Sequence, residues 1–346
     1  MKRNLALRDD GIGATMGRRA LMMLACAGIF FSAGPALAAQ DVKLNEVLRS
    51  VFYAPQYVAI TIGAFEQEGI NLVGPKTTWG TQASITEIVS GGSNIALLGP
   101  EAAALTQDAG PERRLVNFAK LTDRDGSFII SKTPMPNFKI SDLKGKTIVT
   151  GGAGSTPYLA LVHLIKKAGL DPKKDVNIRA IPISANIIPS FLDGGADFAQ
   201  AFEPGVVKAV TETGAHRVAS VGLLMGALPY TTYMAPASFI EKNPAIIQGF
   251  TNAIQKGLIW TDTHSPAQIA EAIAPFFKDL PLATIQAVVA EYKRTKAWST
   301  DVSIPREGMN QMVDLMVDGA VLKQRVPYEQ IVNPTFFQKA GQGVKR

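Results

Sequence analysis

Between residues 41 and 238 the chain alternates short apolar runs with longer amphipathic stretches. The short runs predict buried strands, and apolar residues spaced three and four positions apart predict helices. This alternation is typical of an α/β architecture with largely parallel sheets. The predicted strands are Lys43–Leu48, Ile95–Leu98, Val116–Leu121, Ser127–Ile130, Thr147–Thr150, Val176–Ala180, Asp197–Ala201 and Arg217–Ser220.

After Ser238 the pattern becomes helical. Asn243–Pro244 and Ser265–Pro266 each place an N-cap residue directly before a proline, which predicts two helix starts. The apolar stripe of the first of these helices consists of Ile246, Ile247, Phe250 and Ile254. We expect this part of the chain to cover the first of two lobes and to have a structural role.

The stretch from Thr150 to Leu170 places glycines between a predicted strand and a predicted helix. Thr156 followed by Pro157 predicts an N-cap with proline at the first helical position. A nucleotide-binding loop is not supported, because Ile140 stands where a Walker motif needs glycine and Pro157 where a dinucleotide motif needs one. A helix N-terminus with free N–H groups therefore predicts a ligand site without residues for cleaving the ligand.

Other strand-to-helix turns also carry aromatic, polar or proline residues. Because helices begin at the carboxyl ends of parallel strands, these turns are expected to line one cleft. The candidate residues on these turns are Tyr53, Pro55, Trp79, Thr81, Gly99, Glu101, Phe202 and Glu203. Aromatic rings would enclose an apolar or planar part of the ligand, whereas an ordinary core role is the alternative for Trp79 and Phe202.

Residues 1–38 are predicted to be a secretory signal peptide. Arg18 and Arg19 precede an apolar run from Ala20 to Phe31, and Ala36–Ala38 provides a small-residue cleavage site. The apolar run is too short for a membrane span. The adjacent arginines are compatible with twin-arginine export, and Met16 is an alternative start. We therefore expect a periplasmic protein.

Composition narrows the class of protein. The 346 residues include one cysteine, Cys26, which lies in the predicted signal peptide, so the exported chain would have no disulfide. Five basic and two acidic residues within 1–38 account for three of the six net positive charges. The exported chain is thus mildly basic, and it has no run of Lys and Arg interleaved with aromatics. Nucleic-acid binding is not expected.

Four longer stretches carry a family resemblance. They are "APQYVAITIGAFEQEGINL", "TEIVSGGSNIALLGPEAAAL", "ISDLKGKTIVTGGAGSTPYLALVHLIKKAGLDPKKDV" and "FLDGGADFAQAFEPGV". In this order, from about Val42 to Ala219, the chain resembles the nitrate/sulfonate/taurine/thiamine-precursor family of ABC-transporter substrate-binding proteins. The resemblance implies a type II periplasmic binding protein, with two α/β lobes, a ligand cleft between them and a helical C-terminal part.

The resemblance also implies an organisation and a partner. Lobe 1 would comprise residues 41–126 and 230–346, lobe 2 residues 127–229, and the crossovers would fall near Asp123–Phe128 and Leu228–Pro236. It adds Ser155, Thr156 and Tyr230 to the ligand-binding residues. The implied partner is an ABC permease in the inner membrane. A monomer without cofactor, metal or catalytic activity is expected.

The predicted turns also bear on the ligand. They contain Glu101 and Glu203 but no Lys or Arg, which an anion such as nitrate or a sulfonate would need. Because a buried carboxylate must be paired or hydrogen-bonded, this favours a heterocycle with N–H donors, such as a pyrimidine-like thiamine precursor, over a small free anion. An organic sulfonate or another anion is the alternative, because either glutamate could instead cap a helix of its own lobe.

Two other function classes compete with solute delivery. Some proteins of this fold make a pyrimidine precursor by consuming their own histidine, but His163, His216 and His264 all lie away from the predicted site turns. The enzyme hypothesis is therefore disfavoured. A ligand-binding sensory or accessory protein is the second alternative, and the sequence does not separate it from a transport receptor.

Overall fold

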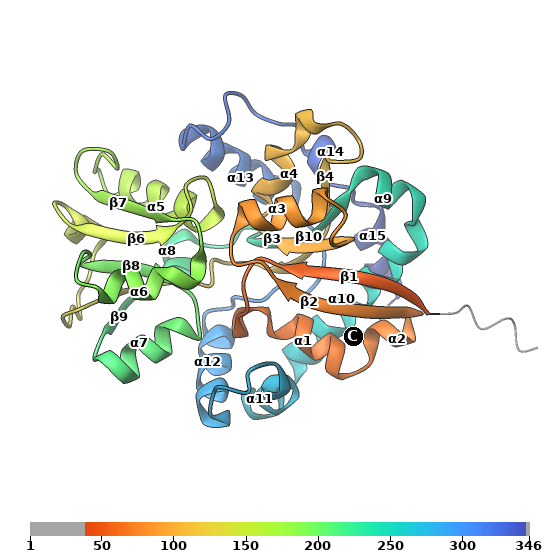
Figure 1. The fold of residues 1–346 in the computed structure, drawn as a ribbon, viewed down its shortest axis with the longest axis horizontal. Coiled ribbons are helices and arrows are strands. Elements are labelled where there is room, and N and C mark those ends of the chain that lie inside the picture. Colours follow the sequence, from red (N-terminus) through yellow and green to blue (C-terminus); the bar gives the residue numbers. More distant parts are fainter. Residues whose placement is uncertain (1–38, 344–346) are drawn as a thin grey trace, which may run out of the picture. The chain divides into compact units, whose positions relative to one another are not determined.

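The computed structural model describes residues 39–343 (Figure 1), so the predicted signal peptide lies outside the described part. The described chain forms two five-stranded sheets. The first sheet has the order β2 (Ile70–Thr77), β1 (Gln40–Glu46), β3 (Ile95–Leu98), β10 (Thr231–Pro236), β4 (Leu115–Thr122). The second sheet has the order β7 (Asn177–Ile181), β6 (Thr147–Gly151), β8 (Phe198–Ala201), β5 (Phe128–Ser131), β9 (His216–Ser220). We call each sheet with its flanking helices a lobe.

Helices occupy most connections between strands and the whole segment after β10 (Figure 1). Those before β10 are α1 (Ala54–Thr61), α2 (Ala64–Gln67), α3 (Thr81–Val89), α4 (Glu101–Leu105), α5 (Thr156–Lys167), α6 (Ile187–Leu192), α7 (Gly205–Thr213) and α8 (Val221–Met225). Those after it are α9 (Ala237–Lys242), α10 (Pro244–Thr263), α11 (Pro266–Ile273), α12 (Leu282–Arg294), α13 (Arg306–Asp318), α14 (Tyr328–Ile331) and α15 (Thr335–Gly343). The predicted α/β fold class with a helical C-terminal part is confirmed.

The sheets are mixed, which corrects the expectation of largely parallel sheets. Each sheet has two parallel and two antiparallel pairings. The antiparallel strands are β5 and β10, each the first strand after the chain passes from one sheet to the other. A strand that enters a sheet from the opposite lobe runs against its neighbours, whereas strands connected by helices within one lobe run parallel to one another.

Two strands, β2 and β10, were not predicted from the sequence, for different reasons. β2 contains Gly74 and Pro75, which interrupt its apolar pattern, and proline is tolerated there because β2 is an edge strand. β10 is buried along its whole length and therefore shows no alternation of apolar and polar residues. Leu228–Pro236 had been expected to be a crossover, but only its first three residues precede β10.

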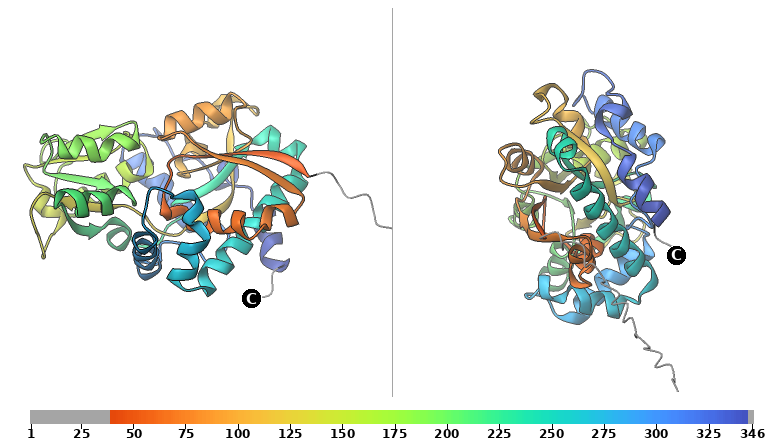
Figure 2. Two further views of the ribbon diagram at one scale, coloured as in Figure 1. Left: turned by 60° about the horizontal axis from the view of Figure 1, so that its bottom comes forward. Right: turned by 90° about the vertical axis from the view of Figure 1, so that its right-hand side faces the viewer.

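The C-terminal helices pack mainly on the first lobe. The predicted stripe of α10 is buried, and α10 contacts α1, α15 and β4 (Figure 2). Two helices also reach the other lobe. α13 contacts α5, and the hydroxyl of Tyr292 in α12 accepts a hydrogen bond of 3.4 Å from the N–H of Glu203, which follows β8. The C-terminal segment therefore helps to join the lobes.

We expect Gly257→Ala to lower the free energy of unfolding by about 2 kcal/mol. A Cβ at this position of α10 would lie 2.4 Å from the carbonyl oxygen of Pro55 and 2.8 Å from Cβ of Ala59, so α1 and α10 would have to separate. At an exposed helix position the same change would instead stabilise by about 1 kcal/mol. Urea denaturation shows whether the substitution lowers or raises the free energy of unfolding. A more stable variant would contradict this close packing of α1 and α10.

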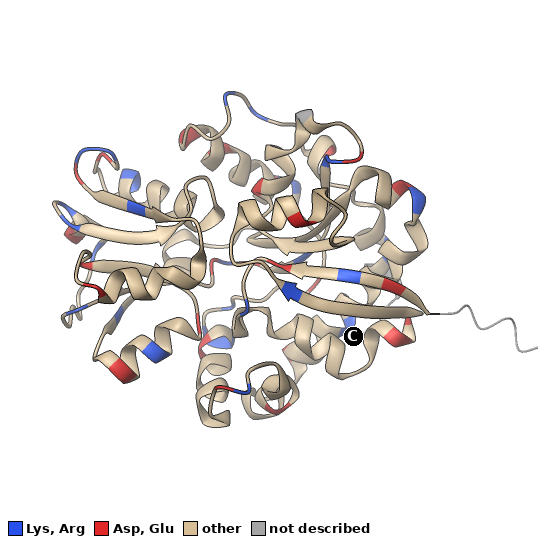
Figure 3. Ribbon diagram, viewed as in Figure 1, with Lys and Arg blue, Asp and Glu red and all other residues tan. Residues whose placement is uncertain are grey.

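The surface is mixed in charge. Figure 3 shows Lys and Arg interspersed with Asp and Glu over both lobes. Among residues 39–343, none of the helices combines the length and the apolar character that crossing a membrane requires.

Candidate ligand-binding site

A hollow of about 340 Å³ lies between the two lobes, and we call it the inner hollow. The first lobe contributes the segment after β1 and the starts of α3 and α4, and the second lobe contributes the β6–α5 loop and the ends of β7 and β8. The inner hollow therefore lies where helices begin at the carboxyl ends of strands, as expected for ligand sites in such sheets. Its lining comprises Val47, Leu48, Tyr53, Gly80, Thr81, Gln82, Gly99, Glu101, Leu105, Gly151, Gly152, Ala153, Gly154, Ser155, Thr156, Pro157, Ile181, Pro182, Ser184, Ile187, Phe202, Tyr230 and Thr231.

The structure brings most of the predicted site residues together at this hollow. Those that line it are Tyr53, Thr81, Gly99, Glu101, Ser155, Thr156, Phe202 and Tyr230. Pro55 does not, because it is buried in α1 against α10. Trp79 and Glu203 line a neighbouring hollow instead. These three predicted residues therefore lie outside the lining of the inner hollow.

Glu203 interacts with residues of its own lobe. Its carboxylate forms an ion pair with Arg217 of β9 and accepts a hydrogen bond of 2.7 Å from the N–H of Val207, at the start of α7. Burial raises the pKa of Glu203, and the Arg217 guanidinium opposes this rise. Glu203 therefore caps a helix and does not offer a free carboxylate to the inner hollow.

Glu101 joins the two lobes. It begins α4 in the first lobe, and its Oε1 accepts a hydrogen bond of 3.1 Å from the N–H of Thr156, at the start of α5 in the second lobe. The hydroxyl of Thr156 donates to the other carboxylate oxygen. Gly99 permits this contact, because a Cβ there would lie 2.0 Å from Glu101 Oε2. The carboxylate also meets the partial positive charge of the α5 N-terminus.

Burial raises the pKa of Glu101, and its hydrogen bonds with Thr156 oppose this rise. These bonds exist only when the lobes are in contact. Glu101 therefore stabilises the contact between the lobes, in addition to lining the inner hollow.

Two polar side chains of the inner hollow lack partners. Among the described residues, Ser155 Oγ and Ser184 Oγ are buried and form no hydrogen bond with the protein. The hydroxyl of Tyr230, which also lines the hollow, interacts with the carboxylate of Asp125. Buried polar atoms without partners are rare, since each one costs free energy. Ser155 is the N-cap residue of α5, one position before the predicted N-cap, yet its side chain does not cap the helix. The hydroxyls of Ser155 and Ser184 are thus available to a bound molecule.

The lining of the inner hollow contains only one charged side chain. Its lining includes no Lys or Arg, and Glu101, its single carboxylate, is already engaged by Thr156. The remaining surface combines hydroxyls and helix N–H groups with the apolar side chains of Leu48, Ile187 and Phe202. This arrangement suits an uncharged molecule with a polar and an apolar part.

The sequence matches the family described as NMT1/THI5 like over residues 52–268. The chain belongs to this family. A relative from Bacillus subtilis (strain 168), named "Putative binding protein YtlA", is 34% identical over 330 residues, which are 94% of this chain and 98% of that protein. The family resemblance drawn from the four sequence stretches is thereby confirmed.

Solved structures support the fold of this NMT1/THI5-like chain. The periplasmic nitrate-binding protein NrtA from Synechocystis PCC 6803 has a TM-score of 0.73 at 13% identity, with 89% of each chain covered. The alkanesulfonate-binding protein SsuA from Xanthomonas axonopodis pv. citri, solved bound to MOPS, has a TM-score of 0.70 at 16% identity, covering 85% of this chain and 98% of its own. The desulfurization enzyme DSZB shares the fold with a TM-score of 0.60 at 13% identity, covering 88% and 99%. At these identities the likeness establishes the two-lobed fold alone.

Sequence reasoning missed several lining residues, of which Ser184 matters most. It follows β7 in a turn that begins with Pro182 and continues as a short 3₁₀ helix, so it lacks the cap-plus-proline pattern of the predicted turns. Its position after a strand of the second sheet was the one available signal. Leu105 lies on a predicted helix but carries no pattern that distinguishes it from ordinary helix residues.

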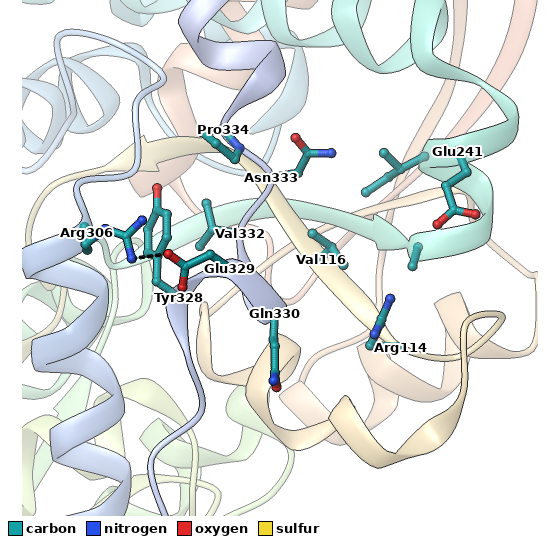
Figure 4. Close-up of a pocket in the computed structure, with 12 residues that line it drawn as sticks. Arg114, Val116, Glu241, Arg306, Tyr328, Glu329, Gln330, Val332, Asn333 and Pro334 are labelled. Carbon is teal, nitrogen blue, oxygen red and sulfur yellow. Dashed lines mark ion pairs between the residues drawn. The ribbon is translucent and has the colours of Figure 1, made fainter.

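Another hollow, of about 410 Å³, lies on the first lobe (Figure 4). Val116 of β4 and Arg114, which directly precedes β4, line it together with residues of α9, α13 and α14. Arg306 and Glu329 form an ion pair of 2.5 Å in its wall. Because the second lobe contributes nothing to it, movement of the lobes would not enclose a molecule there. Among the described residues, no group of His, Cys, Asp and Glu has an arrangement that could hold a metal ion.

Proposed function

We propose that this protein is an exported, non-enzymatic receptor that binds a small uncharged molecule between its lobes and delivers it to an ABC permease. The NMT1/THI5-like family and the YtlA relative, which is named a binding protein, support the receptor part. The predicted signal peptide of residues 1–38 supports a periplasmic location. Lobe 1 would comprise residues 41–126 and 230–346, and lobe 2 residues 127–229.

One observation carries this proposal. The unpartnered hydroxyls of Ser155 and Ser184 line the inner hollow together with the starts of α3 and α5. Both hydroxyls belong to the second lobe, whereas Thr81 and Gln82 at the start of α3 belong to the first. A molecule that bonds with the two hydroxyls and with the start of α3 would therefore hold the lobes together, and it would be released when they separate.

The ligand that fits best is an uncharged heterocycle, such as a pyrimidine. Hydroxyls donate and accept hydrogen bonds, as the ring nitrogens and amino groups of such a molecule do. NrtA and SsuA are named for anions, nitrate and alkanesulfonates. An anion in the inner hollow of this chain would meet helix N–H groups but no guanidinium or ammonium group.

Thermal unfolding in the presence of candidate ligands tests the proposal, because a ligand that binds only the folded state raises Tm. We expect uncharged pyrimidines to raise Tm and nitrate, ethanesulfonate and benzoate to leave it unchanged. A rise with the sulfonate alone would favour the anion alternative. A folded protein whose Tm responds to none of these compounds would contradict the proposal.

The two alternative functions, a synthase and a sensory protein, predict different experimental results. A synthase that consumes its own histidine needs that side chain at the ligand, but His163, His216 and His264 do not line the inner hollow. A change in mass of the protein after incubation with iron, absent in His163→Ala, would support the enzyme. A sensory role would instead be supported if the protein copurified with a signalling protein and not with a permease.

A further inference from the structure

A second hollow, of about 530 Å³, adjoins the inner hollow, and we call it the outer hollow. The two share the wall residues Leu48, Ser184, Ile187 and Phe202. Like the inner hollow, the outer hollow receives residues from both lobes, among them α6 and α7 of the second (Figure 1). The two hollows therefore form neighbouring parts of one cleft.

Four of the five charged side chains that line the outer hollow form ion pairs. Arg49 pairs with Glu46 at 2.5 Å, Lys208 with Asp279 at 2.6 Å, and Glu203 with Arg217. Glu212 is exposed to water. The surface left for a ligand is apolar, and it comes from aromatic and branched aliphatic side chains. These include Trp79, Ile188, Leu192, Phe276 and Phe277.

Two of these apolar side chains are unusually exposed. Trp79 retains 39% and Leu192 40% of the accessible surface that each would have in an open chain. Such side chains in a concave site are typical of surfaces that a ligand covers. An indole in addition offers a large flat face for an apolar or aromatic group.

The backbone conformation of Trp79 and a hydrogen bond from the other lobe fix the position of its side chain. Its φ of 60° lies in the left-handed region, which is unfavourable for a residue other than glycine. Its carbonyl accepts a hydrogen bond of 3.1 Å from the N–H of Ser184 in the other lobe. The contact between the lobes therefore holds the indole at the wall of the outer hollow. Strained residues of this kind concentrate at ligand sites.

We propose that the outer hollow is a second compartment of the ligand site, which binds an apolar tail, aromatic or branched aliphatic, on a ligand whose uncharged head lies in the inner hollow. This inference rests on the proposed function. The tail would pass beside Phe202 and Ile187, which belong to both hollows, and lie against Trp79 and Leu192. The unpartnered Ser184 Oγ on the shared wall would bond with a polar atom at the junction of head and tail.

Calorimetric titration with 4-aminopyrimidine and 4-(benzylamino)pyrimidine tests this inference, since the two share a head and differ in the tail. We expect the benzyl compound to bind the wild-type protein about tenfold more tightly. In Trp79→Ala and in Leu192→Ala this advantage should fall below about threefold, with the affinity for 4-aminopyrimidine little changed. Leu223→Ala is the matched control, because Leu223 is 49% exposed and lines neither hollow.

Each outcome is decisive. Equal affinities of the two compounds for the wild-type protein would overturn the second compartment and leave the proposed function intact. An advantage that survives in both variants, or that Leu223→Ala abolishes as well, would also overturn it. If neither compound binds, the uncharged head is wrong, and both proposals fall.

Discussion

Asp125→Asn is expected to raise the free energy of unfolding at pH 7 by up to about 3 kcal/mol and to leave it unchanged near pH 4. Asp125 lies in the passage from β4 to β5 and is 3% exposed. Its Oδ1 accepts hydrogen bonds from the N–H and the hydroxyl of Ser127, at 2.7 and 2.5 Å.

Burial raises the pKa of Asp125 from 3.8 to about 6, and the bonds from Ser127 and the nearby Tyr230 hydroxyl oppose this only in part. Because the folded state binds the proton more tightly, the stabilisation is complete below pH 3.8 and is lost as the pH rises through 6. A difference of two pKa units corresponds to about 3 kcal/mol. Asparagine has the same shape and no charge, so it avoids this loss.

Urea denaturation of both proteins between pH 4 and pH 8 measures the effect. The difference between variant and wild type isolates Asp125 from Glu46, Glu101 and Glu203, whose pKa values burial also raises. We expect this difference to grow from near zero at pH 4 and to level off above pH 6. A difference that does not depend on pH would contradict a buried, titrating Asp125.

Glu101→Ala is expected to weaken ligand binding about 100-fold, which corresponds to roughly 3 kcal/mol. Without the carboxylate, closing of the lobes would bury the N–H and the hydroxyl of Thr156 without their partner. Glu101→Gln is the matched variant, because its amide can accept from the N–H and donate to the hydroxyl oxygen of Thr156. Its affinity should stay within about fivefold of wild type.

The ligand affinities of the wild-type protein and of Glu101→Gln are also expected to differ in their dependence on pH. The pKa of Glu101 is raised in the closed form, whereas an open cleft would return it toward its ordinary value of 4.5. Protonation therefore favours closure, and wild-type affinity should decline as the pH rises above 4.5. In Glu101→Gln this decline should be absent. Calorimetric titration with the pyrimidine that raises Tm most, over pH 4.5–8, measures both effects, and parallel pH profiles would argue against a role of Glu101 in closure.

The sequence predicted the fold where local pattern and position agree. β3 was predicted with its observed bounds, because four buried apolar residues stand between polar turns. Asn243 and Ser265 were predicted as N-cap residues and are found there. By contrast, β10 has no local signal, since its pairing with β3 and β4 brings together segments more than a hundred residues apart.

The candidate site was predictable to the extent that it uses helix starts. Gly99 and Thr156 lie on such turns, and the structure places both at the inner hollow. The partner of a carboxylate was not predictable, because it depends on which side chain faces it across the cleft. Glu101 and Glu203 have similar sequence surroundings, yet Glu101 bonds across the lobes and Glu203 pairs within its own.

The central claim is that the unpartnered hydroxyls of the inner hollow bind the ligand, and the double variant Ser155→Ala/Ser184→Ala tests it most directly. Neither hydroxyl has a partner within the described chain, so their removal should leave Tm unchanged or slightly higher. Calorimetric titration with the pyrimidine that raises the wild-type Tm most is predicted to show binding at least about tenfold weaker in the double variant. Equal affinity in a variant with wild-type Tm would contradict the claim and place the ligand elsewhere.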